Sequence, residues 1–188
     1  GLKMYMVGQT YNTVYQYTLT TAWDLSTASY ASISFSVNAE SVGTQDLAFS
    51  SDGTKMFVVG YISDTVYQYT LSTAWNVSTA SYDSVSFSVA SQESTPRGMK
   101  FNPDGTMMWI VGSTNNTVYQ YSLTTAWDIS TASYDSISFS VLSQQAYSMG
   151  VKFSSDGNKM YITGQSPSSV FQYSTLGVFG GTARISIG

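Results

Sequence analysis

A unit of 52 residues repeats along the chain, and it constrains the fold more than any other feature. The segments 53–104 and 105–156 are identical at 31 of 52 positions. The segment 1–52 aligns with them without a gap, and 157–188 is a fourth, incomplete copy. The glycine of one turn marks the period, at Gly1, Gly53, Gly105 and Gly157. Such a period predicts a repeat architecture in which each copy is one supersecondary unit.

Each copy is predicted to hold four short strands. In the copy 97–148 we expect them at 98–101, 107–111, 117–123 and 136–141. The sequence Asn-Pro-Asp-Gly between the first two is a hairpin signal, because Asp starts a turn and Gly accepts a positive φ. The second strand is almost continuously apolar, which is typical of burial on both faces. The last two alternate, and in the fourth the serines are expected to face water.

Four antiparallel strands in a repeat of this length are typical of a β-propeller blade. The segment 98–101 is then the innermost strand and 136–141 the outermost. We therefore predict an all-β fold, a β-propeller built from 52-residue four-stranded blades, with about 3.5–4 blades per chain. Residues 1–188 form a single repeat domain in this interpretation, with copies at 1–52 (partial), 53–104, 105–156 and 157–188 (partial). A β-sandwich or a solenoid is the alternative.

The composition excludes several classes of function. With no His and no Cys, the chain has no imidazole base, thiolate nucleophile or disulfide, and a zinc site is not expected. Its 7 basic and 11 acidic residues give a net charge of −4, a poor match for nucleic acid. No apolar run reaches the roughly 18 residues of a membrane span. The aspartates of the Asp-Gly turns lack the spacing of a calcium loop, so we expect no cofactor and no metal.

Two strings carry a resemblance to known families. Residues 103–112 read PDGTMMWIVG and residues 116–121 read NTVYQY, and the pattern recurs at 52–69 and 156–173. It resembles the YVTN-type repeats of surface-layer propellers and is similar to NHL and lactonase-like propellers. The resemblance implies a propeller fold. The lactonase-like enzymes rely on His and acidic residues near the central face, so a chain without His is not expected to share their activity.

A Trp-containing connection stands outside that general pattern. It occupies 21–30, 73–82 and 125–134, and it resembles repetitive surface or phage-associated proteins. Aromatic residues at the same repeat position in every copy are predicted to pack between blades. If they are exposed, they would instead stack against the rings of a bound sugar. The two columns are Trp23, Trp75 and Trp127, and Tyr30, Tyr82 and Tyr134.

The copies do not complete a ring. The first copy lacks its first strand, and 182–187 is expected to form a final outer strand. Blade faces left open would be large apolar surfaces, which soluble proteins avoid. We expect self-association, in which a homodimer completes a ring of seven or eight blades, or further repeats of a longer chain. Closure as a small four-bladed ring is the alternative.

The copies differ most in two connections, which a propeller places on the same face. One is the turn between the second and third strands, and the other joins one blade to the next. Variation gathered on one face indicates a binding surface, although loops that drift without constraint would look the same. The candidate ligand-binding residues of this face are Glu40, Asp46, Tyr61, Asp64, Glu93, Arg97, Asn115, Gln145 and Tyr147.

Charged residues are also expected in the central channel. Lys100 and Lys152 occupy equivalent places on the innermost strand, where an earlier copy has Ala48. They would attract an anion or simply be solvated there.

From these features we expect a non-catalytic recognition or adhesion module that binds a glycan or a surface protein. Its location is predicted to be extracellular, at a cell surface or a virion surface. The alternative is a structural repeat unit that assembles into a larger ring or filament. A lactonase-like or lyase-like enzyme ranks last, because without His it would need carboxylates and a metal.

Overall fold

The computed structural model describes residues 1–175, which form four antiparallel sheets. The first sheet holds β1 (Lys3–Met6), β2 (Thr13–Leu19) and β3 (Ala28–Ser36). The second holds β4 (Thr44–Phe49), β5 (Lys55–Gly60), β6 (Thr65–Leu71) and β7 (Ala80–Ser88). The third holds β8 (Pro96–Phe101), β9 (Met107–Gly112), β10 (Thr117–Leu123) and β11 (Ala132–Ser140). The fourth holds β12 (Ser148–Phe153), β13 (Lys159–Gly164) and β14 (Val170–Ser174).

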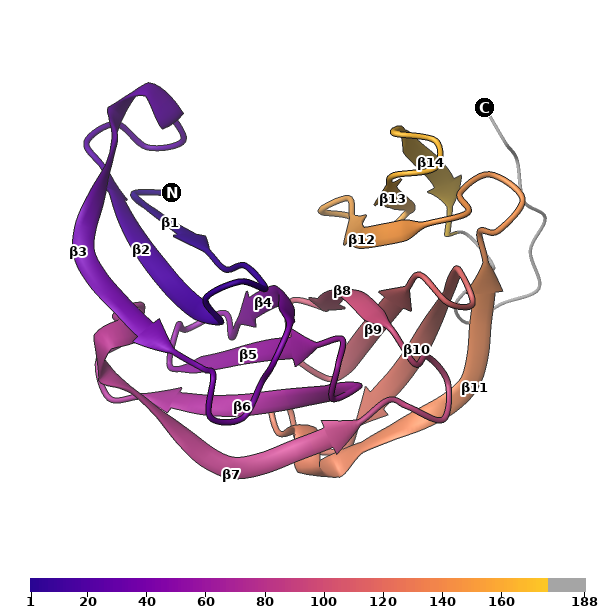
Figure 1. Ribbon diagram of the computed structural model, residues 1–188, viewed down its shortest axis with the longest axis horizontal. Helices are drawn as coiled ribbons and strands as arrows, with labels where there is room; N and C mark the ends of the chain where they lie inside the picture. The colour runs from indigo at the N-terminus through magenta and orange to yellow at the C-terminus, as the bar shows by residue number, and fades with distance from the viewer. Residues whose placement is uncertain (176–188) are drawn as a thin grey trace.

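The four sheets follow one another around an open arc (Figure 1). In each sheet the strands pair in chain order, so β4, β8 and β12 lie at the inner rim and β3, β7 and β11 outside. This confirms the all-β propeller architecture and the predicted order from inner to outer strand. The predicted strand at 182–187 lies outside the described residues. Within residues 1–175, no helix is long and apolar enough to span a membrane.

The outer strands begin earlier than predicted. We expected the fourth strand of the third sheet at 136–141, whereas β11 starts at Ala132. The cause is Ser136, whose φ of 59° marks a bulge where the pairing of β10 with β11 shifts register. An inserted residue reverses the alternation on its two sides, so a period-2 pattern recognises only the part beyond the bulge. Ser32 and Ser84 repeat this conformation.

The Trp column packs within the fold. Trp127 has a φ of 61°, and its ring covers Gly105, where an added Cβ would lie 2.3 Å from the indole. The same ring lies 5.4 Å from that of Phe101 and 6.2 Å from that of Phe57 in the preceding sheet. Trp75 repeats the contact with the glycine of its own turn, Gly53. The prediction of packing between blades is confirmed for Trp127, whereas the cited contact of Trp75 is with its own turn.

Side-chain hydrogen bonds join each sheet to the next. Gln16 Oε1 accepts from the backbone N–H of Val77 at 3.2 Å, which links the first and second sheets. Gln68 Oε1 accepts from Ile129 N–H at 3.1 Å, which links the second and third. Val77 and Ile129 are fully buried, so these two amides would have no solvent partner if the glutamine were absent.

The junction between the second and third sheets lacks one hydrogen bond that its neighbours have. Asn12 Oδ1 accepts from Thr44 N–H at 3.0 Å, and Asn116 Oδ1 accepts from Ser148 N–H at 2.9 Å. At the equivalent place the acceptor is Asp64 and the donor position is Pro96, which has no N–H. Asp64 Oδ1 is buried without a partner. Burial, and secondarily the charge of Glu93, raise the pKa of Asp64.

We predict that Pro96→Thr stabilises the fold at neutral pH. The raised pKa means that ionised Asp64 costs folded-state stability as the pH rises through its titration. A threonine N–H would bond that carboxylate, and the net gain should be about 1 kcal/mol after the loss of proline rigidity. Urea unfolding should show that the substitution raises the free energy of unfolding more at pH 7 than near pH 4.

Asp64→Ala supplies the control for this prediction. In that background Pro96→Thr has no acceptor to reach and should give no gain. An equal gain in both backgrounds would show that the threonine acts through something other than Asp64.

Candidate functional site

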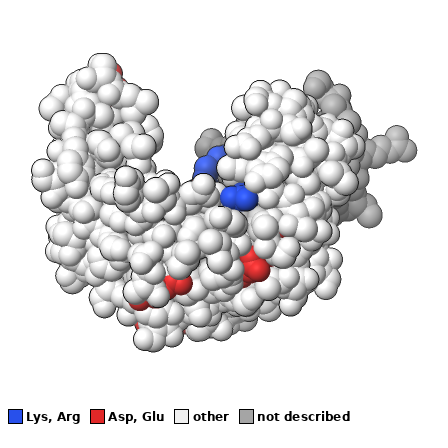
Figure 2. Space-filling model, viewed as in Figure 1, with Lys and Arg blue, Asp and Glu red and all other residues white. Residues whose placement is uncertain are grey.

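A cleft opens at the inner rim where loops of all four sheets meet. It has a volume of 440 Å³, and we call it the central cleft. The first sheet contributes its β1–β2 loop, the second the start of β4 and the β5–β6 turn, the third the start of β8, and the fourth two loops beside β12. Its polar and aromatic lining includes Gln9, Gln45, Tyr61, Arg97, Tyr147 and Gln165. Figure 2 shows basic side chains at the central hollow of the arc.

Arg97 is held between two tyrosines in the central cleft. Its guanidinium carbon lies 4.4 Å from the ring centre of Tyr61 and 5.5 Å from that of Tyr147. Arg97 Nη2 donates to the hydroxyl of Tyr147 at 2.9 Å, and Nε donates to Ser113 Oγ at 3.3 Å. These contacts orient a planar cation, which can pair with a carboxylate, a phosphate or a carbonyl oxygen through its remaining N–H groups.

The arginine clamp is made of exceptions to the repeat. Arg97 stands where the neighbouring copies have Gln45 and Met149. Tyr61 and Tyr147 likewise replace smaller residues at their repeat positions. Their equivalents are Gln9, Ser113 and Gln165 for Tyr61, and Gly43 and Thr95 for Tyr147. The clamp therefore exists once among the described copies.

Charged residues of the inner strands β4, β8 and β12 interact with one another. Asp46 Oδ2 accepts from Met99 N–H at 2.9 Å and lies 3.6 Å from Lys152 Nζ. The side chains of Asp46 and Lys152 are 24% and 59% exposed, so both reach solvent. Burial lowers the pKa of Lys100, the nearby charge of Lys152 lowers it further, and Asp46 partly opposes this. Lys100 and Lys152 also line a neighbouring cleft of 330 Å³, so both predicted channel lysines face open space.

The structure brings three of the nine predicted site residues into contact, namely Tyr61, Arg97 and Tyr147. Asp46, a fourth, follows Gln45 along β4 and contacts Met99 and Lys152 instead. Sequence reasoning missed the glutamines of the lining. Gln45 Nε2 donates to Gln9 Oε1 at 3.0 Å, so two of them already pair across the first and second sheets. The sequence could have indicated Gln9 and Gln45, because both lie in the connections that differ between copies.

The other five predicted residues have contacts that serve the loops. Glu40 accepts from the hydroxyl of Tyr69 at 3.0 Å, and Asn115 Nδ2 donates to Gln92 O at 2.8 Å. Asp64 lies at the junction described above.

Glu93 and Gln145 are fully buried and bind backbone N–H groups of turns, which places them beneath the face rather than on it. Variation between copies does not distinguish a buried loop anchor from an exposed contact residue.

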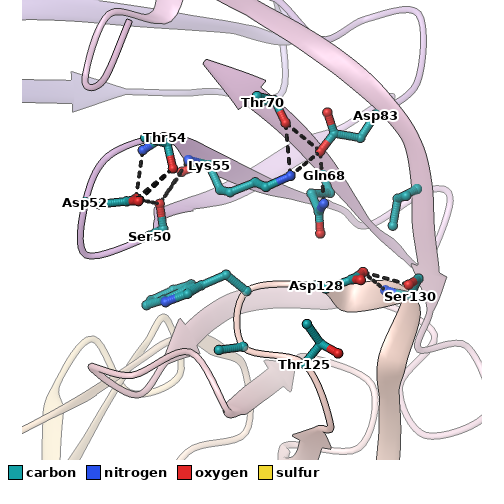
Figure 3. Close-up of a pocket in the computed structure, with 13 residues that line it drawn as sticks. Ser50, Asp52, Thr54, Lys55, Gln68, Thr70, Asp83, Thr125, Asp128 and Ser130 are labelled. Carbon is teal, nitrogen blue, oxygen red and sulfur yellow. Dashed lines mark hydrogen bonds and ion pairs between the residues drawn. The ribbon is translucent and has the colours of Figure 1, made fainter. Parts of the chain in front are cut away.

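A larger cleft of 680 Å³ lies between the second and third sheets (Figure 3). Its acidic groups are already engaged. Asp83 Oδ2 accepts from Lys55, Gln68 and Thr70 at 2.9 Å each, and these bonds outweigh the effect of burial and keep the pKa of Asp83 low. Asp52 binds its own turn, chiefly through Ser50, which lowers its pKa to about 2. These contacts indicate a structural role.

Residues 1–175 contain no cluster of three or more acidic, His or Cys side chains that could hold a metal ion.

A family model and several solved structures match the chain. The model is that of the lactonases with a seven-bladed β-propeller, and it matches residues 40–180. The chain belongs to this family. No curated protein matches it in sequence.

The solved structures share the fold at low sequence identity. A proposed 6-phosphogluconolactonase of Bacteroides uniformis has a TM-score of 0.64 and 14% identity, and the match covers 100% of this chain and 53% of that one. For the periplasmic gluconolactonase of Pseudomonas aeruginosa the TM-score is 0.59, the identity 14% and the coverage 93% and 47%. For a proposed 6-phosphogluconolactonase of Bacteroides fragilis the TM-score is 0.60 and the identity 11%, and the match covers 87% of this chain and 44% of that one. The chain thus spans about half the length of these neighbours.

Family membership corrects the functional expectation. We expected a non-catalytic adhesion or glycan-binding module displayed on a cell or virion surface, and this is wrong, because the family to which the chain belongs is a family of lactonases, which are enzymes. Of the resemblances, the lactonase type is the one supported, and the surface-layer type is not. The error came from treating the absence of His as evidence against hydrolysis. A carboxylate can also act as a general base, and lysine or arginine can stabilise an oxyanion.

Gly112 leaves the space in which a buried carboxylate holds the loops of this face. Gly112 adjoins Glu93, and a Cβ added there would lie 2.3 Å from Glu93 Cγ. Glu93 in turn accepts from the N–H groups of Thr95, Thr114 and Asn115 at 3.0 to 3.2 Å. The missing side chain at 112 therefore makes room for the carboxylate that anchors the β9–β10 turn.

We predict that Gly112→Ala destabilises the fold by about 1–3 kcal/mol, because the added methyl group collides with Glu93 and with the backbone carbonyl oxygen of Thr95, 2.4 Å from the added Cβ. Gly8 occupies the equivalent position in the first copy, and a Cβ there would meet nothing within 4 Å. Gly8→Ala should therefore change the free energy of unfolding by less than about 0.5 kcal/mol. Chemical denaturation of both variants tests the pair, and equal effects would contradict the role assigned to Glu93.

Proposed function

We propose that this chain provides the catalytic face of a lactonase that hydrolyses the lactone of a sugar acid carrying an anionic substituent. The observation that supports it is the Arg97 clamp, a cation oriented by Tyr61 and Tyr147 in a cleft shared by four sheets. The substrates named for the structural neighbours are lactones of gluconate or its phosphate. A phosphate or carboxylate matches the guanidinium in both charge and geometry.

Asp46 is proposed as the general base. Its carboxylate is partly exposed, and two backbone N–H groups, of Leu47 and Met99, fix it in place at 2.9 Å each. It would remove a proton from water as the water oxygen attacks the lactone carbonyl carbon. The bond from that carbon to the ring oxygen then breaks, the ring oxygen takes up a proton, and the open-chain acid results. Water is the only co-reactant.

Lys152 is proposed to stabilise the negative charge that develops on the carbonyl oxygen. It lies 3.6 Å from Asp46, so a carbonyl group placed beside the carboxylate would also be within reach of the ammonium group. Lys100 adds positive potential along the same wall. Its lowered pKa makes it easier to deprotonate than an exposed lysine, so it is a candidate donor of the proton to the leaving oxygen.

Each sheet is proposed to be one blade of the propeller, with the 52-residue repeat as the blade period. An extracytoplasmic location also belongs to the proposal. A neighbour of this fold is described as periplasmic, which supports it, whereas display on a surface or virion has no support in the comparisons.

Hydrolysis of 6-phosphogluconolactone and of gluconolactone tests the proposed function. Both lactones also hydrolyse spontaneously, so the rate above background should be followed by proton release at a fixed, mildly acidic pH. We predict that Asp46→Asn lowers kcat about 10²–10⁴-fold, the range of a lost general base. Arg97→Ala should raise KM about 10–100-fold for the phosphorylated lactone, and less for the neutral one.

Asp104→Asn is the matched control, since it neutralises an exposed carboxylate that binds Thr106 of its own turn and lines neither the central cleft nor the cleft of Lys100 and Lys152. It should leave both parameters unchanged. Equal loss of activity on the two lactones in Arg97→Ala would argue against the role of the clamp. Full activity in Asp46→Asn would exclude that residue as the base.

A further inference from the structure

A second cleft at the inner rim has a different lining from that of the central cleft. It has a volume of 330 Å³ and is lined mainly by the second and third sheets, and we call it the lysine cleft. Along β4, Gln45 lines the central cleft and residues 47–51 line the lysine cleft, so Asp46 stands between the two. Sites for small ligands have volumes of about 300–1,000 Å³. The lysine cleft therefore suits a compact molecule of one or two rings.

One wall of the lysine cleft is aromatic. The second sheet contributes Phe49 and Trp75, whose ring centres lie 5.5 Å apart. The third sheet contributes Phe101 and Trp127, whose ring centres lie 5.4 Å apart. Trp75 remains 36% exposed although its ring covers Gly53. An exposed indole in a concave site favours an aromatic ligand, which would stack on the ring and bury apolar surface.

A break in the repeat makes room in the lysine cleft. The inner strands of three successive sheets have Ala48, Lys100 and Lys152 at one repeat position. Ala48 lines the cleft, and its methyl group takes up much less space than the lysine of the next two copies. The second and third sheets each have a neighbour on both sides within the described residues (Figure 1). The walls that they form are therefore fixed by contacts of this chain.

The charged side chains that line the lysine cleft are two cations, Lys100 and Lys152. Among the described residues, Lys100 Nζ has neither a hydrogen bond nor an ion pair, whereas Lys152 lies 3.6 Å from Asp46. Asp46 is shared, because it also accepts from Met99 N–H. Burial lowers the pKa of Lys100, and the charge of Lys152 lowers it by more than Asp46 raises it. Lys100 thus lies in a positive potential that the described residues do not neutralise.

A half-buried ammonium group without an acceptor is unfavourable, because it has lost part of its hydration and gained no partner. The lysine of the largest cleft shows the contrast. Lys55 Nζ donates to Asp83 at 2.9 Å and to Thr70 at 3.0 Å. An anion in the lysine cleft would give Lys100 the acceptor that Lys55 already has.

We propose that the lysine cleft binds an aromatic carboxylate, with the carboxylate on Lys100 and Lys152 and the ring against Trp75 and the phenylalanines beside it. The carboxylate would accept charge-assisted hydrogen bonds from the two ammonium groups. This ligand differs from the substrate of the proposed function, whose anionic substituent binds Arg97. Its binding requires no catalysis. Because the proposed reaction also uses Lys152, an aromatic carboxylate in this cleft would inhibit that reaction.

The first test is isothermal titration calorimetry with 2-naphthoate and with its neutral counterpart, 2-naphthylmethanol. We expect naphthoate to bind at one site per chain, and more tightly than the alcohol. Lys100→Met should weaken naphthoate binding about 10–100-fold, the effect of a lost hydrogen bond to a charged group, and should leave binding of the alcohol nearly unchanged. Lys100→Arg keeps the charge and should retain most of the affinity.

Arg97→Met is the matched control, because it removes the cation of the central cleft and leaves the lysine cleft intact. Its affinity for naphthoate should equal that of the unaltered chain. A loss of affinity in Arg97→Met with none in Lys100→Met would place the anion in the central cleft and overturn the proposal. Equal affinities for naphthoate and the alcohol, or no binding at millimolar naphthoate, would overturn it as well.

The second test uses the unaltered chain, so it does not depend on how a variant folds. The chain is treated with acetic anhydride in the presence and absence of 2-naphthoate, and the acetylated lysines are located by mass spectrometry of its peptides. Naphthoate should slow the acetylation of Lys100 and Lys152, whereas Lys55, which Asp83 holds in the other cleft, should react at the same rate. Unchanged rates at Lys100 and Lys152 would contradict binding there. Lactone hydrolysis, measured separately, can fail without affecting either result.

Discussion

The contact between neighbouring sheets is the interaction on which this fold depends. A three-stranded or four-stranded sheet of this chain has apolar side chains on both faces, so it needs a neighbour on each side. Phe87 and Tyr121 pack edge to face at 5.5 Å across one junction, and Phe139 and Tyr173 at 5.2 Å across the next. Such aromatic pairs add about 0.5–1.5 kcal/mol each beyond the area that they bury. The hydrogen bonds of Gln16 and Gln68 fix the register, because a buried amide without an acceptor would cost more than the bond gains.

Because the junction is repeated, the positions that break the repeat are informative. The pairing of Asp64 with Pro96 removes a hydrogen bond at the junction that also contributes Arg97. The missing hydrogen bond lowers the stability of this junction, whose other contacts are favourable. Such a local loss of folding free energy is typical of functional sites, where a residue is retained for its function although it destabilises the fold. Pro96 directly precedes Arg97 and fixes the backbone from which the guanidinium projects.

The fold was predictable from sequence because its signals are local and occur several times. The Asp-Gly turns and the apolar strand at 107–111 each predict the same architecture in several copies. The bulge at Ser136 was not predicted, since a single residue with positive φ has no periodic signature.

The site was only partly predictable. Arg97, Tyr61 and Tyr147 belonged to the expected face, but their stacking joins residues up to 86 positions apart, which no local pattern reveals. Glu93 has the same kind of variability and yet is buried.

A site for one small, asymmetric substrate cannot consist of repeated positions alone. Identical loops around an axis would offer the same group from every repeat, whereas the lactone of the proposed function would need different groups at its reacting carbonyl and at its anionic substituent. This chain meets that requirement by differences between copies. Arg97 stands where Gln45 and Met149 are its equivalents, and Asp46 stands where the other inner strands have Gly98 and Gly150. Those glycines are needed where β8 and β12 approach closely, since a Cβ on Gly98 would lie 2.7 Å from Gly150 Cα. A carboxylate is therefore excluded from that position in β8, whereas β4 has room for one, which binds Met99 N–H and lies near Lys152.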